Sequence, residues 1–88
     1  MRIRVIRVTR NFERSYRKLP RRVQRVAERK ELLFRDNPFD TQLKTHRLDV
    51  KEREVWAFSV LHSHRIKFIF LTEGEVLFLD IGTHGIYE

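Results

Sequence analysis

The last third of the chain contains three apolar runs that are separated by two short polar segments. The runs are VWAFSVL, RIKFIFL and EVLFLDI, and the segments HSH and TEG lie between them. Runs of this length, rich in Val, Ile and Phe, are typical of β-strands, and connections this short join antiparallel neighbours. The segment therefore predicts two successive β-hairpins, and any fold for this chain has to include them.

The pairing of these strands follows from which side chains can share a face. A three-residue loop at His62-Ser63-His64 and a two-residue turn at Glu73-Gly74 both bring the large apolar residues together. We expect that face to pack on helices; it comprises Trp56, Phe58, Ile66, Phe68, Phe70, Leu77 and Leu79.

The second face of the predicted sheet is more polar. It carries Ser59, Arg65, Lys67, Asp80, Gly82 and His84, so that Lys67 lies across from Asp80 and Arg65 across from Gly82. It also carries four apolar residues, Ile69, Leu71, Val76 and Phe78. Because large uncovered apolar patches are uncommon on monomers, we expect a partner to cover part of this face.

The first half of the chain predicts a strand followed by two helices. RIRVIRV alternates apolar and basic residues over residues 2–8, as strands do. Thr9 or Asn11 can cap a short helix, and Pro20 suits the first turn of a second helix that runs to about Arg35. The apolar residues of both helices recur at helical spacing: Phe12, Tyr16, Leu19, Val23, Val26, Ala27, Leu33 and Phe34.

Asn37-Pro38 ends the second helix, and a polar connection containing His46 leads from there to the hairpins. The sequence contains no repeat and no linker, so we expect residues 1–88 to form a single α+β domain. Cysteine is absent, and no apolar run is long enough for a signal peptide or a membrane span. These features favour a soluble protein of the cytoplasm.

Positive charge is concentrated in the helical half of the chain. Residues 1–35 contain 13 Lys and Arg against three Asp and Glu, whereas residues 36–88 contain six against nine. The second helix carries a stripe of Arg22, Arg25 and Arg29, which Lys18 and Arg21 extend. A surface of this kind favours binding to nucleic acid or to an acidic protein.

Histidines and cations gather at one end of the predicted sheet and allow two kinds of chemistry. His62, His64 and His84 could hold a metal ion, but no further ligand stands at a recognised spacing, and Arg65 would repel a dication. Cleavage of RNA needs a base, an acid and a fixed cation for the phosphate. The residues that supply this set are His64, Arg65, His84 and Tyr87, with Lys67 as a second cation. We therefore expect no metal and no cofactor.

Five segments in this order resemble the RelE/ParE superfamily of type II toxin–antitoxin toxins. They are NFERSYRKLP, LKTHRLD, VWAFSV, SHRIKFIF and VLFLDIGTHGIY. The resemblance implies a β-α-α-β-β-β fold, with an antiparallel sheet and two N-terminal helices packed on one face. It also implies a ribosome-dependent mRNA endonuclease that works without metal and is silenced by a cognate acidic antitoxin.

The resemblance implies site residues as well. The family's catalytic arginine, histidine and tyrosine match Arg65, His84 and Tyr87, and the histidine of its L-x-x-H-x-L element matches His46. Ser59 stands where many nucleases of the family have a basic residue. Two alternatives therefore remain: a ParE-like toxin that inhibits DNA gyrase by binding, and a non-catalytic RNA-binding module.

Overall fold

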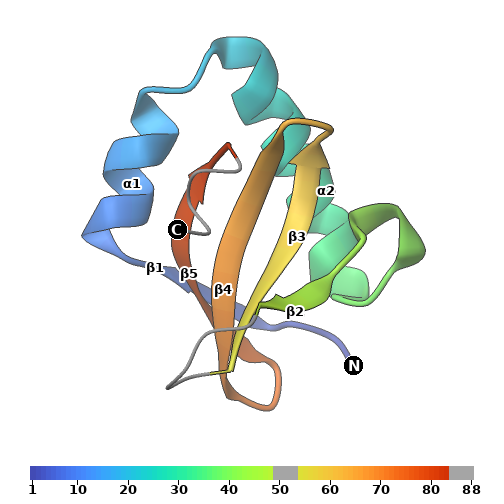
Figure 1. Ribbon diagram of the computed structural model, residues 1–88. Coiled ribbons are helices and arrows are strands. Elements are labelled where there is room, and N and C mark those ends of the chain that lie inside the picture. Colours follow the sequence, from blue (N-terminus) through green and yellow to red (C-terminus); the bar gives the residue numbers. More distant parts are fainter. Residues whose placement is uncertain (49–53, 84–88) are drawn as a thin grey trace.

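The computed structural model describes residues 1–48 and 54–83, which form two α-helices and a five-stranded sheet (Figure 1). Along the chain the elements are β1 Val5–Val8, α1 Arg10–Arg17, α2 Arg21–Asp36, the 3-10 helix η1 Thr41–Leu43, β2 His46–Leu48, β3 Val55–Leu61, β4 His64–Thr72 and β5 Glu75–Gly82. The strand order is β1-β5-β4-β3-β2. The predicted α+β class is confirmed.

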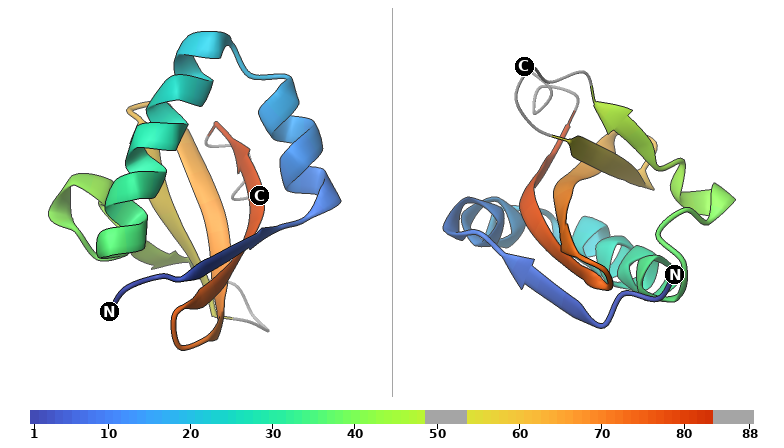
Figure 2. Two further views of the ribbon diagram at one scale, coloured as in Figure 1. Left: turned by 180° about the vertical axis from the view of Figure 1, so that it is seen from behind. Right: turned by 90° about the horizontal axis from the view of Figure 1, so that it is seen from below.

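Both helices cover the same face of the sheet, as predicted (Figure 2). Helix α1 packs on β5, and helix α2 packs on β3. Thr9 caps α1: its Oγ1 accepts a hydrogen bond from the Phe12 amide at 3.0 Å and donates one to the Leu79 carbonyl at 2.8 Å. Such a cap contributes about 1 kcal/mol to helix stability. Here it also fixes the start of α1 to the sheet.

Phe34 is the centre of the core. Its ring lies 4.6 Å from that of Phe58, 4.9 Å from Phe68 and 5.6 Å from Phe78, so one helix residue contacts three strands. Each aromatic pair contributes about 0.5–1.5 kcal/mol beyond the burial of apolar area. This side chain therefore links α2 to all three strands.

The first hairpin has a different turn from the predicted one. His64 already belongs to β4 and pairs with Leu61, which leaves a two-residue turn at His62-Ser63. A bulge between Ser59 and Leu61 then shifts the pairing by one residue, so that Phe58 meets Ile66. Without the bulge a two-residue turn would set Phe58 against a lysine; the extra residue returns the apolar side chains to the core face.

The second hairpin turns at Glu73-Gly74 as predicted, but its register changes along the strands. Ile66 pairs with Ile81 and Lys67 with Asp80, both as expected, whereas Phe68 pairs with Phe78. Two irregularities in the ladder, between Lys67 and Phe68 and between Phe70 and Thr72, cause the change.

These bulges correct the predicted core. Val76 and Phe78 are buried in the core cluster, whereas Leu77 and Leu79, which we expected there, are half-buried outside it. Val76 and Phe78 therefore cannot anchor a partner on the second face. Phe58, Ile66 and Phe68 are buried as predicted, and Trp56 and Phe70 pack against the core from its edge.

Strand β1 makes the sheet mixed. It is shorter than the predicted residues 2–8 and pairs with β5 in parallel, with Val5 opposite Glu75 and Val8 opposite Phe78. The expectation of an antiparallel sheet is therefore correct for the other strand pairs only. The long crossover that a parallel pair requires is supplied by the rest of the chain between β1 and β5.

Gly74 fits the turn between β4 and β5 against β1. Its φ of +80° is one that residues with a Cβ rarely adopt, and an added Cβ would lie 3.3 Å from the Arg2 carbonyl oxygen. The Gly74 carbonyl accepts hydrogen bonds from the amides of Arg4 and Val5 at 2.7 and 3.1 Å. The turn and the first strand thus depend on the same glycine.

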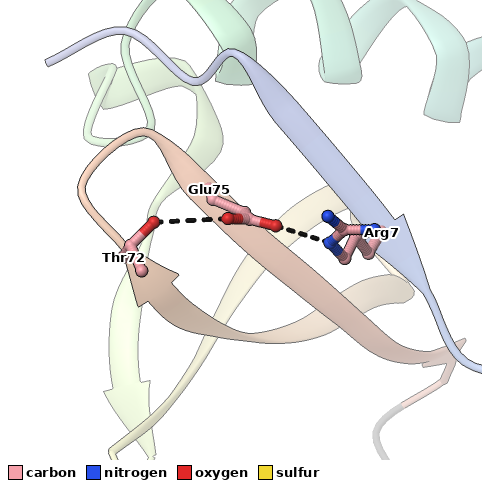
Figure 3. A network of polar contacts seen from close by, with 3 residues as sticks. All are labelled: Arg7, Thr72 and Glu75. Carbon is pink, nitrogen blue, oxygen red and sulfur yellow. Dashed lines mark hydrogen bonds and ion pairs between the residues drawn. The ribbon is translucent and has the colours of Figure 1, made fainter.

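An ion pair beside this turn also joins β1 to β5 (Figure 3). The Arg7 guanidinium donates to Glu75 Oε2, and the Thr72 hydroxyl donates to Glu75 Oε1 at 3.3 Å. The hydrogen bond from Arg7 is the main reason why the pKa of Glu75 lies below its usual value. Because both residues reach solvent, the pair contributes little to stability.

The connection after α2 contains structure that the sequence did not predict. Residues 41–43 form η1, with Leu43 fully buried, and residues 46–48 form the edge strand β2. β2 places His46 opposite Ala57 of β3. None of the helices in the described ranges is long and apolar enough to cross a membrane.

Candidate functional site

Two rows of paired residues cross the sheet on the face that points away from the helices. One row runs through His46, Ala57, Lys67 and Asp80, and each residue pairs with the next. Directly paired residues project to the same side of a sheet, and Ala57 alternates with the core residue Phe58. Since strands lie about 4.8 Å apart, the backbones of His46 and Lys67 are separated by roughly 10 Å.

The second row contains Ser59, Arg65 and Gly82. It lies two residues further along the strands, so Arg65 and Lys67 are neighbours on this face of β4. Gly82 is the last residue of β5. The structure thus places Arg65 and Lys67 together on β4, with His46 on the same face two strands away on β2.

The Arg65 side chain closes the β3–β4 turn. Its Nη1 donates to the carbonyl oxygens of Leu61, His62 and His64 at 3.1, 3.0 and 3.0 Å. Arginine presents five N–H donors, and among the described residues neither Nε nor Nη2 of Arg65 has an acceptor. One edge of the guanidinium is therefore fixed by the turn, and the other edge can accept an anion.

The predicted histidines and tyrosine are distributed unevenly. His64 is half-buried at the start of β4, and its Nδ1 lies 2.9 Å from the hydroxyl of Ser63. His46 is exposed, and its Nδ1 lies 3.0 Å from the Lys44 carbonyl oxygen. His84 and Tyr87 lie outside the described residues, so their predicted roles stay predictions.

The basic stripe lies on the other side of the molecule. Lys18, Arg22, Arg25 and Arg29 are exposed on the helices, as predicted, whereas Arg65 and Lys67 belong to the sheet face away from the helices. The exception is Arg29, which lines a groove that Arg65 also reaches. The basic stripe and the sheet site are therefore separate except at this groove, where Arg29 and Arg65 meet.

A metal site does not form within residues 1–48 and 54–83, because no three His, Asp or Glu side chains gather there in a suitable group. The site that this part of the chain does offer is a pair of cations, Arg65 and Lys67, on a face that also carries His46. Cations in such an arrangement suit a phosphodiester and the charge that develops on its oxygens.

Solved toxin structures share this fold at low sequence identity. A chain of the archaeal RelE–RelB complex from Pyrococcus horikoshii OT3 superposes with a TM-score of 0.74 at 12% identity, over 97% of this chain and 98% of that chain. The YoeB/ParE toxin from Agrobacterium tumefaciens gives 0.77 at 14% identity, over 92% and 99%. The chain has the RelE-like toxin fold.

A chain of the E. coli DinJ–YafQ toxin–antitoxin complex matches the RelE-like fold equally well, with a TM-score of 0.75 at 16% identity over 98% of this chain and 97% of that one. No family model and no curated protein sequence matches the chain. The resemblance based on sequence motifs is thus confirmed at the level of the fold.

Sequence reasoning missed three features that bear on the candidate site. It did not predict β2, the three-residue strand that sets His46 in the same row as Lys67. It also did not predict that Arg65 holds the turn. Nor did it predict the groove that Arg29 and Arg65 line. Leu32 was the available signal, because this leucine falls outside the apolar spacing of its helix and had no predicted packing partner.

Proposed function

We propose that this protein is the toxin of a type II toxin–antitoxin system and acts as a ribosome-dependent mRNA endonuclease. The observation that carries the proposal is the pairing of a RelE-like fold with Arg65 and Lys67 side by side on the sheet face away from the helices. The matching of this chain's motifs to the family's catalytic positions supports it further.

Arg65 is the residue that binds the scissile phosphate. Its Nη1 is held by three turn carbonyls, so its orientation is set before substrate arrives. The remaining Nε and Nη2 form the planar edge that suits two phosphate oxygens. Lys67 supplies a second positive charge on the same face. Preorganised donors of this kind stabilise the transition state because they need no reorganisation during the reaction.

The proton transfers are assigned to His84 and Tyr87, with His46 or His64 as their partner. A base takes the proton of the 2′-hydroxyl, whose oxygen then bonds to phosphorus. The bond from phosphorus to the 5′ oxygen breaks, and an acid protonates that oxygen. The products are a 2′,3′-cyclic phosphate and a 5′-hydroxyl. The reaction as written needs no metal ion.

The helical surface would hold the ribosome and the partner protein. Exposed Lys18, Arg22, Arg25 and Arg29 suit the phosphate backbone of ribosomal RNA and mRNA. The partner expected for a toxin of this charge is an acidic antitoxin. The solved complexes with the same fold include the RelE–RelB and DinJ–YafQ complexes.

The test is in vitro translation of a reporter mRNA with the purified chain, followed by primer extension. We expect cuts on ribosome-bound mRNA that are absent when ribosomes are omitted. Translation that proceeds normally without cuts would contradict the proposal.

A ParE-like gyrase inhibitor is the second candidate. It is favoured by the likeness to a toxin described as YoeB/ParE and by Ser59, a neutral residue directly opposite Arg65. A DNA supercoiling assay with gyrase separates the two: inhibition of supercoiling without mRNA cleavage identifies the ParE-like activity. RNA binding without either effect would identify a non-catalytic module.

A further inference from the structure

Lys44 has a backbone conformation that residues with a side chain rarely adopt. Its φ is 51° and its ψ is 40°, in the left-handed region, and no other non-glycine residue of the described ranges has a positive φ. This region crowds the Cβ of an L-residue, so the conformation persists only where the surrounding structure imposes it. Such residues cluster at functional sites, which directs attention to what the backbone of Lys44 contacts.

The turn between η1 and β2 imposes this conformation (Figure 1). Leu43, directly before Lys44, is fully buried, and the amide of Lys44 donates a hydrogen bond to the Thr41 carbonyl at 3.3 Å. Directly after Lys44, the Thr45 hydroxyl donates a hydrogen bond to the Pro38 carbonyl. The chain therefore enters and leaves Lys44 at fixed points, and the direction of the Lys44 carbonyl is fixed with it.

That carbonyl is a partner of the His46 side chain. His46 Nδ1 lies 3.0 Å from the Lys44 carbonyl oxygen. Because a carbonyl oxygen can only accept a hydrogen bond, Nδ1 has to carry the proton. In the neutral imidazole the lone pair then lies on Nε2, which is the nitrogen that accepts a proton. An imidazole free in water favours the opposite tautomer, so the contact with Lys44 reverses the ordinary preference.

The partner of His64 among the described residues imposes no such constraint. His64 Nδ1 lies 2.9 Å from the Ser63 hydroxyl, and a hydroxyl either donates or accepts. Both tautomers of His64 are therefore compatible with its contact. Of the two histidines that can partner the proton transfers, His46 is the one whose tautomer the described part of the fold sets. It also shares its row on the sheet with Lys67.

We propose that Lys44 is a positioning residue for His46. The left-handed backbone of Lys44 directs its carbonyl at His46 Nδ1 and holds the imidazole as a proton acceptor at Nε2. The backbone conformation, and not the ammonium group, has this effect. The tautomer of His46 is a property of the folded chain alone, whereas its consequence for mRNA cleavage rests on the proposed function.

Two substitutions of Lys44 separate its backbone from its charge. Lys44→Asn and Lys44→Val both remove the ammonium group. Asparagine is one of the residues that enter the left-handed region most readily, whereas β-branched valine is a rare outlier there. The two variants thus form a matched pair that differs in tolerance of the conformation. Circular dichroism and urea unfolding establish that both are folded.

Nitrogen NMR of the full chain, labelled with ¹⁵N at histidine, measures the tautomer. Protonated and unprotonated ring nitrogens have well-separated chemical shifts, and at alkaline pH the imidazoles are neutral. A His46→Gln variant identifies the His46 signals by their absence. We expect the Nδ1–H tautomer to predominate in wild type and in Lys44→Asn. In Lys44→Val the ratio of the Nδ1–H to the Nε2–H tautomer should fall about threefold to tenfold, as the loss of one hydrogen bond predicts.

Two results of this measurement overturn the proposal. If the Nε2–H tautomer of His46 predominates in wild type, the Lys44 carbonyl does not set it. If folded Lys44→Val has the same tautomer ratio as Lys44→Asn, the left-handed conformation is not what matters. The wild-type measurement decides the proposal even where Lys44→Val does not fold.

Primer extension on ribosome-bound mRNA tests the consequence for cleavage. Lys44→Val should cleave about 10²-fold more slowly than Lys44→Asn, as expected when a catalytic group is misplaced. In a His46→Ala background the two variants should cleave at equal rates, because the effect passes through the imidazole. A difference that persists without His46 would leave Lys44 a structural role only. Wild type that does not cleave would contradict the proposed function, while the tautomer of His46 still tests the positioning by Lys44.

Discussion

Replacing Arg65 with alanine should affect both stability and cleavage, and the structure gives the size of each effect. Hydrogen bonds that involve a charged donor contribute about 1.5–3 kcal/mol each. Here two N–H groups of Nη1 are shared among three carbonyls in a half-buried turn. Because water reaches this half-exposed turn and can replace the lost donors, the net loss is smaller than the sum of these bonds, about 1–2 kcal/mol. For a domain of this size that lowers Tm by roughly 4–16 °C.

Arg65 lies at the start of a strand, yet its three hydrogen bonds to turn carbonyls make its removal costly. A domain of typical stability, about 5–15 kcal/mol, would still be largely folded after this loss. Cleavage should nevertheless fall about 10²–10³-fold, because a preorganised phosphate donor is gone. The activity loss would thus exceed anything that partial unfolding at 25 °C explains.

Urea unfolding and primer extension on the same preparations measure the two effects separately. Arg14→Ala is the matched control, because Arg14 is an exposed arginine on α1 and should change neither quantity. An Arg65→Ala variant that unfolds at the wild-type urea concentration would show that the turn does not depend on the guanidinium. A variant that still cleaves at the wild-type rate would place the phosphate site elsewhere.

Three further predictions follow from other residues. His84→Ala and Tyr87→Phe should each lower mRNA cleavage about 10²–10⁴-fold in primer extension while urea unfolding stays close to wild type; unchanged cleavage would remove them from the mechanism. Gly74→Ala should destabilise the chain by about 1 kcal/mol or more, seen as a lower Tm, because alanine is strained at φ +80° and meets the Arg2 carbonyl. Arg7 lowers the pKa of Glu75, so the pair's contribution to stability is complete above about pH 4.5 and is lost as the pH falls through the lowered pKa. Arg7→Ala should therefore weaken the pH dependence of urea unfolding below about pH 4.5. An unchanged profile would refute the linkage.

The sequence predicts the helices of this fold better than its strands. The Thr9 cap, the Pro20 boundary and the end of α2 near Arg35 agree with the structure to within about one residue, because capping and proline effects act locally. The parallel pairing of β1 with β5 joins residues about 70 positions apart, and no local signal encodes it. β2 has only three residues, too few for an alternating pattern to be recognised.

The register errors have a different origin, and they did not affect the site. Leu77, Phe78 and Leu79 are consecutive apolar residues, so alternation cannot tell which of them face the core, and a bulge decides it. The polar residues of the same strands are less ambiguous. Exchanging the faces would bury Lys67 and Asp80 among aromatic rings at high cost, because unpaired charges are expensive to bury. Their pairing, and that of Arg65 with Gly82, was therefore predicted correctly. In this chain the charged face fixed the register near the site, while the apolar face left it undetermined in the core.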